Sequence, residues 1–327
     1  MKVLITGGAG FIGSHLSEAL LKKGHEVCVI DNLSTGNIEN IKHLEKKPNF
    51  EFIYDSILNY KMVERAMQDI SFVFHFAASV GVKYILENQV ESIITNVRGT
   101  EIILDIASKK GCGVMIASSS EVYGKNDYGK LSEEGNRIMG ATNVHRWSYA
   151  TSKALDEYLG FAFWREKEIP VKIIRLFNVC GPKQTGMYGM VLPRFVENAL
   201  NNKPIYVYGD GKQIRSFTHV NDAVDAIIRV FESKKAVGQV YNIGSENEIS
   251  IWDLAVKVKD TLKSFSEIVF KSYSDVYPQG FEDMKRRVPD ITKIKRELGF
   301  IPKYSIEDII NDIAKSIRGK NDEKENN

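Results

Sequence analysis

The chain has 327 residues, of which 43% are hydrophobic and 26% are charged, and its formal net charge is +2. These values are those of an ordinary globular protein with enough chain for one large domain or two that share a core. The small net charge gives no case for nucleic acid or a membrane as the main partner, although local basic clusters can bind an anionic ligand.

Two further observations indicate the compartment. No run approaches the roughly 18 apolar residues of a membrane span, and the chain begins with an apolar strand instead of a cleavable apolar segment. Cys28, Cys112 and Cys180 lie far apart and follow neither a metal-ligand spacing nor a disulfide framework. We therefore expect a cytoplasmic protein in a reducing compartment, with no metal site.

The first predicted element is a short apolar strand at residues 2–6, and a glycine-rich turn and a helix from Ser14 to about Lys23 follow it. Gly7, Gly10 and Gly13 permit a tight turn and the close approach of a pyrophosphate to the helix N-terminus. A strand before and a helix after are the context that this motif requires. We therefore predict a dinucleotide site whose contacts also include Phe11 and Ile12.

The second predicted strand, at 26–30, ends at Asp31, which is 18 residues after Gly13. That is close to the spacing expected for a carboxylate that binds the adenosine ribose. A carboxylate here favours NAD over NADP, because it would repel a 2′-phosphate; the alternative is a turn residue at the strand end. The polar loop that follows could border the adenosine through Asn32, Ser34, Thr35 and Gly36.

Two more strands are predicted before residue 80. The strand at 50–54 leads to Ser56 and Ile57, which we expect at the adenine edge. A helix at 60–69 precedes a strand at 72–76, which ends at the small residues Ala77 and Ala78. Small residues let the backbone approach a cofactor, although plain helix–strand packing explains them as well.

A helix at 91–109 and a strand at 113–118 follow, and the strand leads directly to Ser119. The alternation of apolar strands and helices predicts a parallel, doubly wound sheet with right-handed crossovers. Ligands of such sheets bind beyond the carboxyl ends of the strands, which is where Gly7, Asp31 and Ala77 also fall.

Tyr149 and Lys153 are four residues apart in a predicted helix at 148–163. Its apolar stripe would comprise Ala154, Leu155, Tyr158, Leu159 and Ala162. Side chains at this spacing share a helix face, so the phenol and the ammonium point the same way. We expect the ammonium to lower the pKa of Tyr149, which could then take a proton from an alcohol near neutral pH. The alternative is a solvated surface pair.

After a strand at 171–175 the pattern loosens into a smaller, irregular region. Its predicted elements are helices at 191–201, 220–233 and 251–264, a strand at 239–243, loops at 208–215 and 286–290, and a helical region at 291–318. We predict a Rossmann-type domain at 1–175, a substrate-binding cap at 176–318 that is interleaved with it, and a frayed polar tail at 319–327.

These motifs resemble one family, the extended short-chain dehydrogenase/reductases that modify nucleotide sugars. The resemblance covers about residues 1–318. It rests on Gly-Gly-Ala-Gly-Phe-Ile-Gly at 7–13, Asp31-Asn32, His75-Phe76-Ala77-Ala78, Ser119 to Gly124, Tyr149 with Lys153, Asn178 to Pro182, and Arg215. Together these pieces are very specific for the family and much less so for the reaction.

The resemblance implies a mechanism in which the sugar C4 hydroxyl is oxidised transiently, with NAD as the hydride acceptor. By resemblance, Tyr149 is the base, Lys153 holds the nicotinamide ribose, and Ser119 hydrogen-bonds the C4 oxygen. The 4-ketone can then lead to 4-epimerisation, to 4,6-dehydration, or to loss of carbon dioxide from a C5 carboxylate.

The segment Ser119-Ser120-Glu121 is the best discriminator among these outcomes. Dehydratases of the dTDP-glucose type have Thr-Asp-Glu here. UDP-glucuronate decarboxylases have Thr-Ser-Glu, as do some GDP-mannose dehydratases, and simple epimerases usually have no acid. We therefore assign Glu121 to the catalytic residues and Ser120 to the substrate-binding residues. Glu121 could otherwise be an exposed acid or a salt-bridge partner.

The segment from Arg286 to Ile291 also resembles the Arg-Arg-x-Pro-Asp-Ile segment of UDP-glucuronate decarboxylases. Arg287 and Arg215 are candidate diphosphate ligands because arginine suits bidentate phosphate contact. Arg215 could also face the sugar carboxylate, and Asn178 joins the substrate-binding set. Surface salt bridges are the alternative for both arginines.

Some segments depart from the decarboxylase pattern. They are Ala150-Thr151-Ser152 within the Tyr149 motif, Val80 to Tyr84, and Met190. The stretch from Glu282 to Lys285 has no assigned role.

The sequence thus predicts an NAD-dependent lyase or isomerase acting on a UDP-sugar or another nucleotide sugar. It favours a UDP-glucuronate decarboxylase slightly over a 4-epimerase, with a 4,6-dehydratase as a third option. A non-catalytic NAD-binding regulator is the alternative from another class, since fold does not dictate function. By resemblance we expect a homodimer in which helices near 91–109 and 149–164 pair across a two-fold axis.

Overall fold

The computed structural model describes residues 1–126, 128–186, 190–276 and 282–325. Its largest unit is a seven-stranded parallel sheet with the strand order β11-β6-β5-β4-β1-β2-β3. These strands are β1 Lys2–Thr6, β2 Glu26–Asp31, β3 Phe50–Tyr54, β4 Phe72–His75, β5 Gly113–Ser119, β6 Val171–Leu176 and β11 Val240–Ile243. The order reverses between β1 and β4, which is where doubly wound sheets bind their ligands. The predicted Rossmann-type fold is confirmed.

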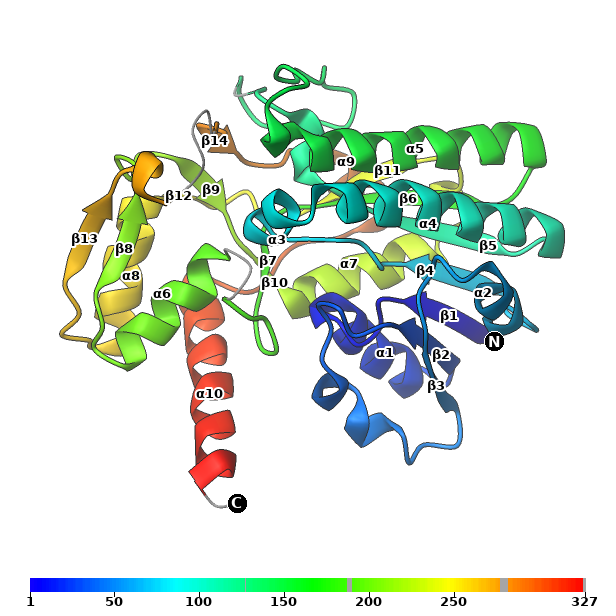
Figure 1. Cartoon of the computed structure of the whole chain (residues 1–327), viewed down its shortest axis with the longest axis horizontal. Coiled ribbons are helices and arrows are strands. Elements are labelled where there is room, and N and C mark those ends of the chain that lie inside the picture. Colours follow the sequence, from blue (N-terminus) through cyan, green and yellow to red (C-terminus); the bar gives the residue numbers. More distant parts are fainter. Residues whose placement is uncertain (127, 187–189, 277–281, 326–327) are drawn as a thin grey trace.

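Helices cover both faces of this sheet (Figure 1). One face carries α1 (Phe11–Lys22) and α7 (Val220–Glu232), and the other carries α2 (Tyr60–Ala66), α4 (Gln89–Lys110) and α5 (Ser148–Lys167). Strands that are covered on both faces must be apolar on both. In β1, Val3 and Ile5 accordingly pack under α1 and α7, whereas Leu4 between them packs under α4.

The apolar stripe predicted for α5 is partly wrong. Leu155 is 42% exposed and Tyr158 is 64% exposed, although Ala154 is buried as expected. The inner face of α5 instead buries small and charged residues, among them Lys153. These side chains approach the ends of the strands, so this helix face is built for polar contacts more than for an apolar core.

The cap lies beside the sheet, on the left of Figure 1. Helices α6 (Val191–Leu200), α8 (Ile251–Leu262) and α10 (Ile306–Glu325) pack around a core of their own with the paired strands β8 (Ile205–Tyr208) and β13 (Ile268–Lys271). The other short strands are β7 Val179–Cys180, β9 Ile214–Ser216, β10 Thr218–His219, β12 Glu248–Ser250 and β14 Arg286–Arg287. The helix α10 includes described residues of the tail that we expected to be frayed.

The two halves interleave in the sequence. Strand β11 returns from the cap region to pair with β6, and α9 (Thr292–Leu298) packs against β11. A short helix, α3 (Val82–Glu87), which the sequence did not predict, precedes α4. No helix within the described ranges is long and apolar enough to cross a membrane.

Candidate functional site

The loop between β1 and α1 has no room for side chains at two glycines. Gly7 has a φ of +71°, and a Cβ there would lie 2.7 Å from the backbone nitrogen of Ala77. A Cβ on Gly13 would lie 2.3 Å from the carbonyl oxygen of Gly7. The loop therefore packs directly on the end of β4, and α1 begins at Phe11 with backbone N–H groups free of a side-chain cap. Such a helix N-terminus can accept a phosphate.

The Asp31 carboxylate fixes this loop through hydrogen bonds to its backbone. Its Oδ2 accepts a hydrogen bond of 2.9 Å from the backbone N–H of Ala9, and its Oδ1 accepts one of 2.8 Å from Leu33. Burial raises the pKa of Asp31, and these backbone donors partly offset the rise. A Cβ on Gly36 would lie 3.0 Å from Asp31 Oδ1, so the polar loop that contains it is folded back against the carboxylate.

The other predicted cofactor residues lie at the same edge of the sheet, with different surroundings. Asn32 and Ser34 are exposed, Thr35 is half-buried, and the Asn32 side chain accepts a bond from the Ser34 backbone. Ser56 is half-buried, but Ile57 is a core side chain that fills the space over Gly99.

The end of β4 carries the last predicted cofactor residues. The Ala77 backbone N–H donates to the Thr6 hydroxyl at 3.1 Å, and Ala78 is half-buried beside it. A carboxylate under a crowded glycine loop, with these small residues next to it, fits a dinucleotide without a 2′-phosphate.

Ser119, Tyr149 and Lys153 come together at the end of β5. Ser119 closes the strand, and Tyr149 and Lys153 occupy the first turns of α5. The Lys153 ammonium lowers the pKa of Tyr149 as expected, but the net shift is upward. Burial raises the pKa of Tyr149, and the Lys153 ammonium and the Ser119 hydroxyl offset only part of that rise. The Glu121 and Asp156 carboxylates raise the pKa further, and Asp156 pairs with the Lys153 ammonium at 2.8 Å.

Glu121 is neither exposed nor free to exchange protons. It lies in a 3₁₀ turn at Ser120–Tyr123, and both of its oxygens pair with the guanidinium of Arg146 at 2.7 and 2.9 Å. Arg287 forms a further ion pair with it. Burial alone would raise the pKa of Glu121, but Arg146, Arg287 and Arg215 lower it to about 2. Glu121 is therefore an anion that orients arginines.

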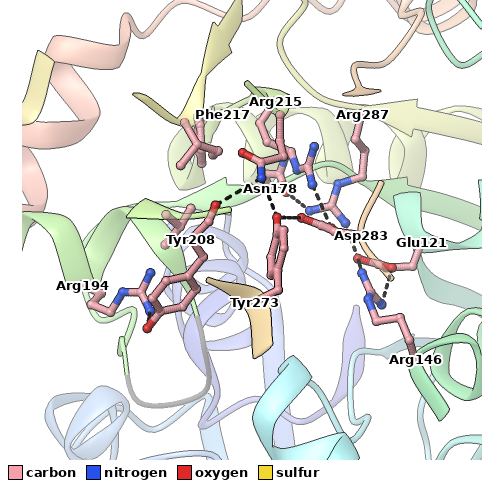
Figure 2. A pocket seen from close by; sticks show the side chains of 13 residues that line it. Glu121, Arg146, Asn178, Arg194, Tyr208, Arg215, Phe217, Tyr273, Asp283 and Arg287 are labelled. Carbon is pink, nitrogen blue, oxygen red and sulfur yellow. Dashed lines mark hydrogen bonds and ion pairs between the residues drawn. The ribbon is translucent and has the colours of Figure 1, made fainter. Parts of the chain in front are cut away.

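A pocket between the end of the sheet and the cap collects side chains from both (Figure 2). From the sheet side come Glu121, Arg146 and Asn178. The residues after the start of α6 contribute Val191, Arg194, Tyr208, Gln213, Arg215, Phe217, Ile251, Tyr273, Asp283 and Arg287. Of the predicted substrate residues, Asn178, Arg215 and Arg287 line this pocket. Ser120 is buried and is not among the residues that line the pocket.

The arginines of the pocket are held by side-chain partners. Arg287 donates to the side-chain amide oxygen Oδ1 of Asn178 as well as to Glu121. Arg215 is buried and pairs with Asp283 at 3.0 Å. The Tyr273 hydroxyl donates to the second oxygen of Asp283. The pocket thus presents cationic groups whose positions are set by a small number of carboxylates.

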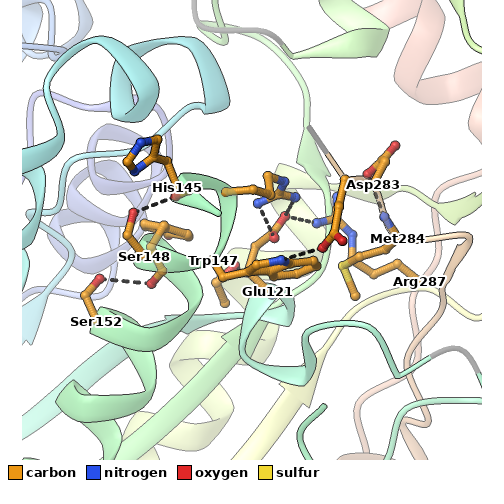
Figure 3. Close-up of polar contacts among 12 residues, drawn as sticks. Glu121, His145, Trp147, Ser148, Ser152, Asp283, Met284 and Arg287 are labelled. Carbon is orange, nitrogen blue, oxygen red and sulfur yellow. Dashed lines mark hydrogen bonds and ion pairs between the residues drawn. The ribbon is translucent and has the colours of Figure 1, made fainter. Parts of the chain in front are cut away.

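Two contributions were missed from the sequence. Arg146 belongs to none of the motifs in the sequence, and the only indication of a role in the site was its position three residues before Tyr149. The stretch 282–285, for which we had no role, crosses the site (Figure 3). Glu282 accepts a bond of 2.8 Å from the Trp147 indole, and Met284 packs on Trp147. No spacing in the sequence predicts these contacts, because the partners lie more than 130 residues apart.

Comparison with known proteins agrees with this geometry. The family model described as GDP-mannose 4,6 dehydratase matches residues 4–313, and the chain belongs to that family. A UDP-N-acetyl-alpha-D-glucosaminuronate decarboxylase of Bacillus cytotoxicus is 44% identical over 94% of this chain and 94% of its own length. UDP-glucuronic acid decarboxylase 2 of Arabidopsis thaliana is 35% identical over 94% of this chain and 66% of that protein.

Among solved structures, the UDP-glucuronic acid 4-epimerase of Bacillus cereus superposes with a TM-score of 0.88. It is 30% identical and the match covers 98% of this chain and 100% of that one. The predicted class, an NAD-dependent enzyme of nucleotide-sugar modification, is confirmed at the level of the family.

Proposed function

We propose that this protein decarboxylates a UDP-linked hexuronate, with UDP-glucuronate and UDP-N-acetylglucosaminuronate as the two candidate substrates. The observation that carries the proposal is the cluster of Arg146, Arg215 and Arg287 around Glu121. A diphosphate and a sugar carboxylate are both anionic, and arginine forks bind such groups bidentately. The decarboxylases among the relatives support the same reading, and the 44% identical one acts by name on the acetamido sugar.

The chemistry follows from the residues at the end of β5. Bound NAD would supply the hydride acceptor for the sugar C4 carbon, and the loop at Gly7 to Gly13 with Asp31 would hold it. Tyr149 would take the C4 hydroxyl proton, and Ser119 would hydrogen-bond the same oxygen. A C4 ketone lies β to the C5 carboxylate, so the carbon–carbon bond to carbon dioxide can break with its electron pair received by the ketone oxygen. Tyr149 and Ser119 would stabilise that oxygen. A proton taken up at C5 and return of the hydride to C4, with the Tyr149 proton returned to the C4 oxygen, would complete the pentose.

Glu121 would act by placing arginines and not by moving protons. With a pKa of about 2 it stays ionised at the pH of the reaction. Its partners Arg146 and Arg287 lie on either side of it, so one carboxylate orients two guanidinium groups. Arg287 and Arg215 would then contact the diphosphate or the uronate.

A proton NMR time course tests this proposal. Purified protein is incubated with UDP-glucuronate, UDP-N-acetylglucosaminuronate, UDP-glucose or UDP-N-acetylglucosamine, with and without added NAD. We expect UDP-pentose signals from a uronate and none from Tyr149→Phe. Interconversion without loss of mass would replace the proposal by a 4-epimerase, and a 6-deoxy methyl doublet would replace it by a dehydratase. Bound NAD with no turnover of any sugar would favour a regulator.

We also propose that the protein is a homodimer joined through α4 and α5. Val90, Ile93 and Ile94 on α4 are exposed, as are Leu155 and Tyr158 on α5. The two helices pack side by side, so these apolar side chains lie on neighbouring helices. Light scattering should give twice the mass of the chain, and a monomeric mass would refute the dimer.

A further inference from the structure

Two acidic residues, Asp156 and Glu157, are buried next to each other on the inner face of α5. Glu157 has a structural explanation: both of its oxygens pair with Arg175 of β6, at 2.7 and 2.9 Å, and Ser118 of β5 donates to it as well. These bonds fasten α5 to two strands of the sheet. The neighbouring Asp156 makes no such bonds.

The Asp156 carboxylate accepts a hydrogen bond of 2.8 Å from the Lys153 ammonium, and the Thr100 side chain of α4 is its other hydrogen-bond partner. Both side chains are almost fully buried, at 0% and 2% exposed. Burying two charges costs several kcal/mol each before their attraction is counted, so a buried pair is weak evidence for a contribution to stability. Within the described residues the one ion-pair partner of this carboxylate is Lys153, so we looked for a functional reason for the pair.

We propose that Asp156 is a positioning residue that holds the Lys153 ammonium on the inner face of α5 and so limits how strongly that charge acts on Tyr149. The inference rests on the proposed function, because Tyr149 and Lys153 are its proposed catalytic pair. Asp156, three residues after Lys153, and Tyr149, four before it, compete for the same cation.

The charged groups around this pair come from several elements. Glu157 pairs with Arg175 of β6. Glu121 after β5 pairs with Arg146, yet it still raises the pKa of Tyr149, and by more than Asp156 does. His75 of β4 faces Lys153 from the sheet, and burial lowers its pKa to about 3, so the ring is neutral. Asp156 is therefore the one carboxylate among these groups that lacks an arginine partner.

Removing the Asp156 carboxylate should shift the pKa values of Tyr149 and Lys153 in the same direction. Burial alone would lower the pKa of Lys153, but Asp156 and Tyr149 reverse this and raise it. Asp156 also opposes ionisation of the Tyr149 phenol. Removing the carboxylate should thus lower the pKa of the phenol and lower the pKa of the ammonium. Both limbs of the pH–activity profile should move to lower pH.

The test compares Asp156→Asn with wild type in full-length protein. For Asp156→Asn we expect both limbs of the kcat profile to shift down by about one pH unit, the size of one charge interaction at short range in a partly polar interior. Asp156→Glu restores a carboxylate and should return the profile toward that of wild type. A second readout needs no turnover. The absorbance of NAD-free protein at 295 nm and pH 10 reports ionised tyrosine, and subtracting the absorbance of the matching protein with Tyr149→Phe isolates Tyr149. This difference should be larger in Asp156→Asn than in wild type.

The control is Asp222→Asn, which removes another buried carboxylate, one that accepts bonds from the backbone of Lys303 and Tyr304. It should lower the melting temperature without moving the profile. Unshifted limbs in a folded Asp156→Asn variant, or an upward shift, would overturn the proposal. So would failure of both Asp156→Asn and Asp156→Ser to fold, because the carboxylate would then be structural. If wild type turns over no uronate, the proposed function fails, and the absorbance difference still decides the role of Asp156.

Discussion

The cofactor loop and the substrate pocket are built in opposite ways. The loop from Gly7 to Gly13 is one short stretch between a strand and a helix, and it packs on the backbone of Ala77 and on the Asp31 carboxylate at neighbouring strand ends. The pocket takes side chains from Glu121 to Arg287, which come from both halves of the molecule. Backbone shape dominates the first region, and paired charges dominate the second.

This difference predicts how each region fails. A substitution in the loop acts locally, through a steric clash with backbone atoms. A substitution in the pocket acts on its neighbours as well, because removing one member of a buried ion pair leaves the other uncompensated. The following predictions test that contrast, from the largest expected effect to the smallest.

Tyr149 is the proposed base, and Tyr149→Phe should have the largest effect. Loss of a general base costs about 10²–10⁴-fold in rate, so we expect kcat to fall by about 10³-fold or more. NAD binding, measured by calorimetry, should change little because the ring is retained. A variant with full activity would show that the base lies elsewhere.

Glu121→Gln should destabilise the protein in a pH-dependent way. The carboxylate has a folded pKa of about 2 and an ordinary value of 4.5. Its contribution, roughly 3 kcal/mol for a shift of this size, is present above about pH 4.5 and is lost as the pH falls toward 2. Urea unfolding of both proteins between pH 3 and 7 should show the difference shrinking at low pH.

A matched control is Glu246→Gln, which removes the partner of Lys130 in a partly exposed pair. Such pairs contribute about 0–1 kcal/mol. A pH-independent difference for Glu121→Gln would mean that its ion pairs do not hold the carboxylate ionised.

The two neighbouring arginines of β14 allow a comparison of a pocket residue with a residue outside the pocket. Arg287 pairs with Glu121 and Asn178, whereas Arg286 pairs with Glu248 outside the pocket. Arg287→Met should lower kcat/KM by about 100-fold, since truncating one partner of a buried charge pair costs 2–5 kcal/mol. Arg286→Met should lower it by less than about threefold. Equal losses would remove Arg287 from the proposed substrate site.

Gly13→Ala should weaken NAD binding by about tenfold or more. The new Cβ would lie 2.3 Å from the Gly7 carbonyl oxygen, and overpacking of this kind costs about 1–3 kcal/mol. Gly319→Ala is the control, because a Cβ at Gly319 meets no atom within 4 Å. Fluorescence titration with NADH measures both. Unchanged affinity in Gly13→Ala would show that the loop can shift without cost.

Asp283→Asn should have the smallest effect and the opposite sign. Asp283 neutralises Arg215 in the pocket, so its loss should tighten UDP binding by about threefold to tenfold at low ionic strength. Glu282→Gln, whose side chain contacts Lys125 and Trp147 outside the pocket lining, should leave UDP binding unchanged. Weaker binding in Asp283→Asn would mean that the carboxylate orients Arg215 more than it competes with the ligand.

Much of this protein could be predicted from its sequence. The glycine loop, Asp31 and the strand–helix alternation are local patterns, and local patterns are set by backbone geometry over a few residues. The spacing of Tyr149 and Lys153 likewise places both on one helix near Ser119. The family, the NAD-dependent class and the fold follow from these features together.

Only the tertiary structure decided the electrostatic state of the site. The sequence places Lys153 near Tyr149, but burial, with smaller contributions from Glu121 and Asp156, gives the Tyr149 pKa its net upward direction. Glu121 is identified by its motif, but its low pKa depends on Arg146 and Arg287, the second of which is 166 residues away. Ion pairs and desolvation depend on which distant side chains the fold brings together and how deeply it buries them, and neither quantity is encoded in local spacing.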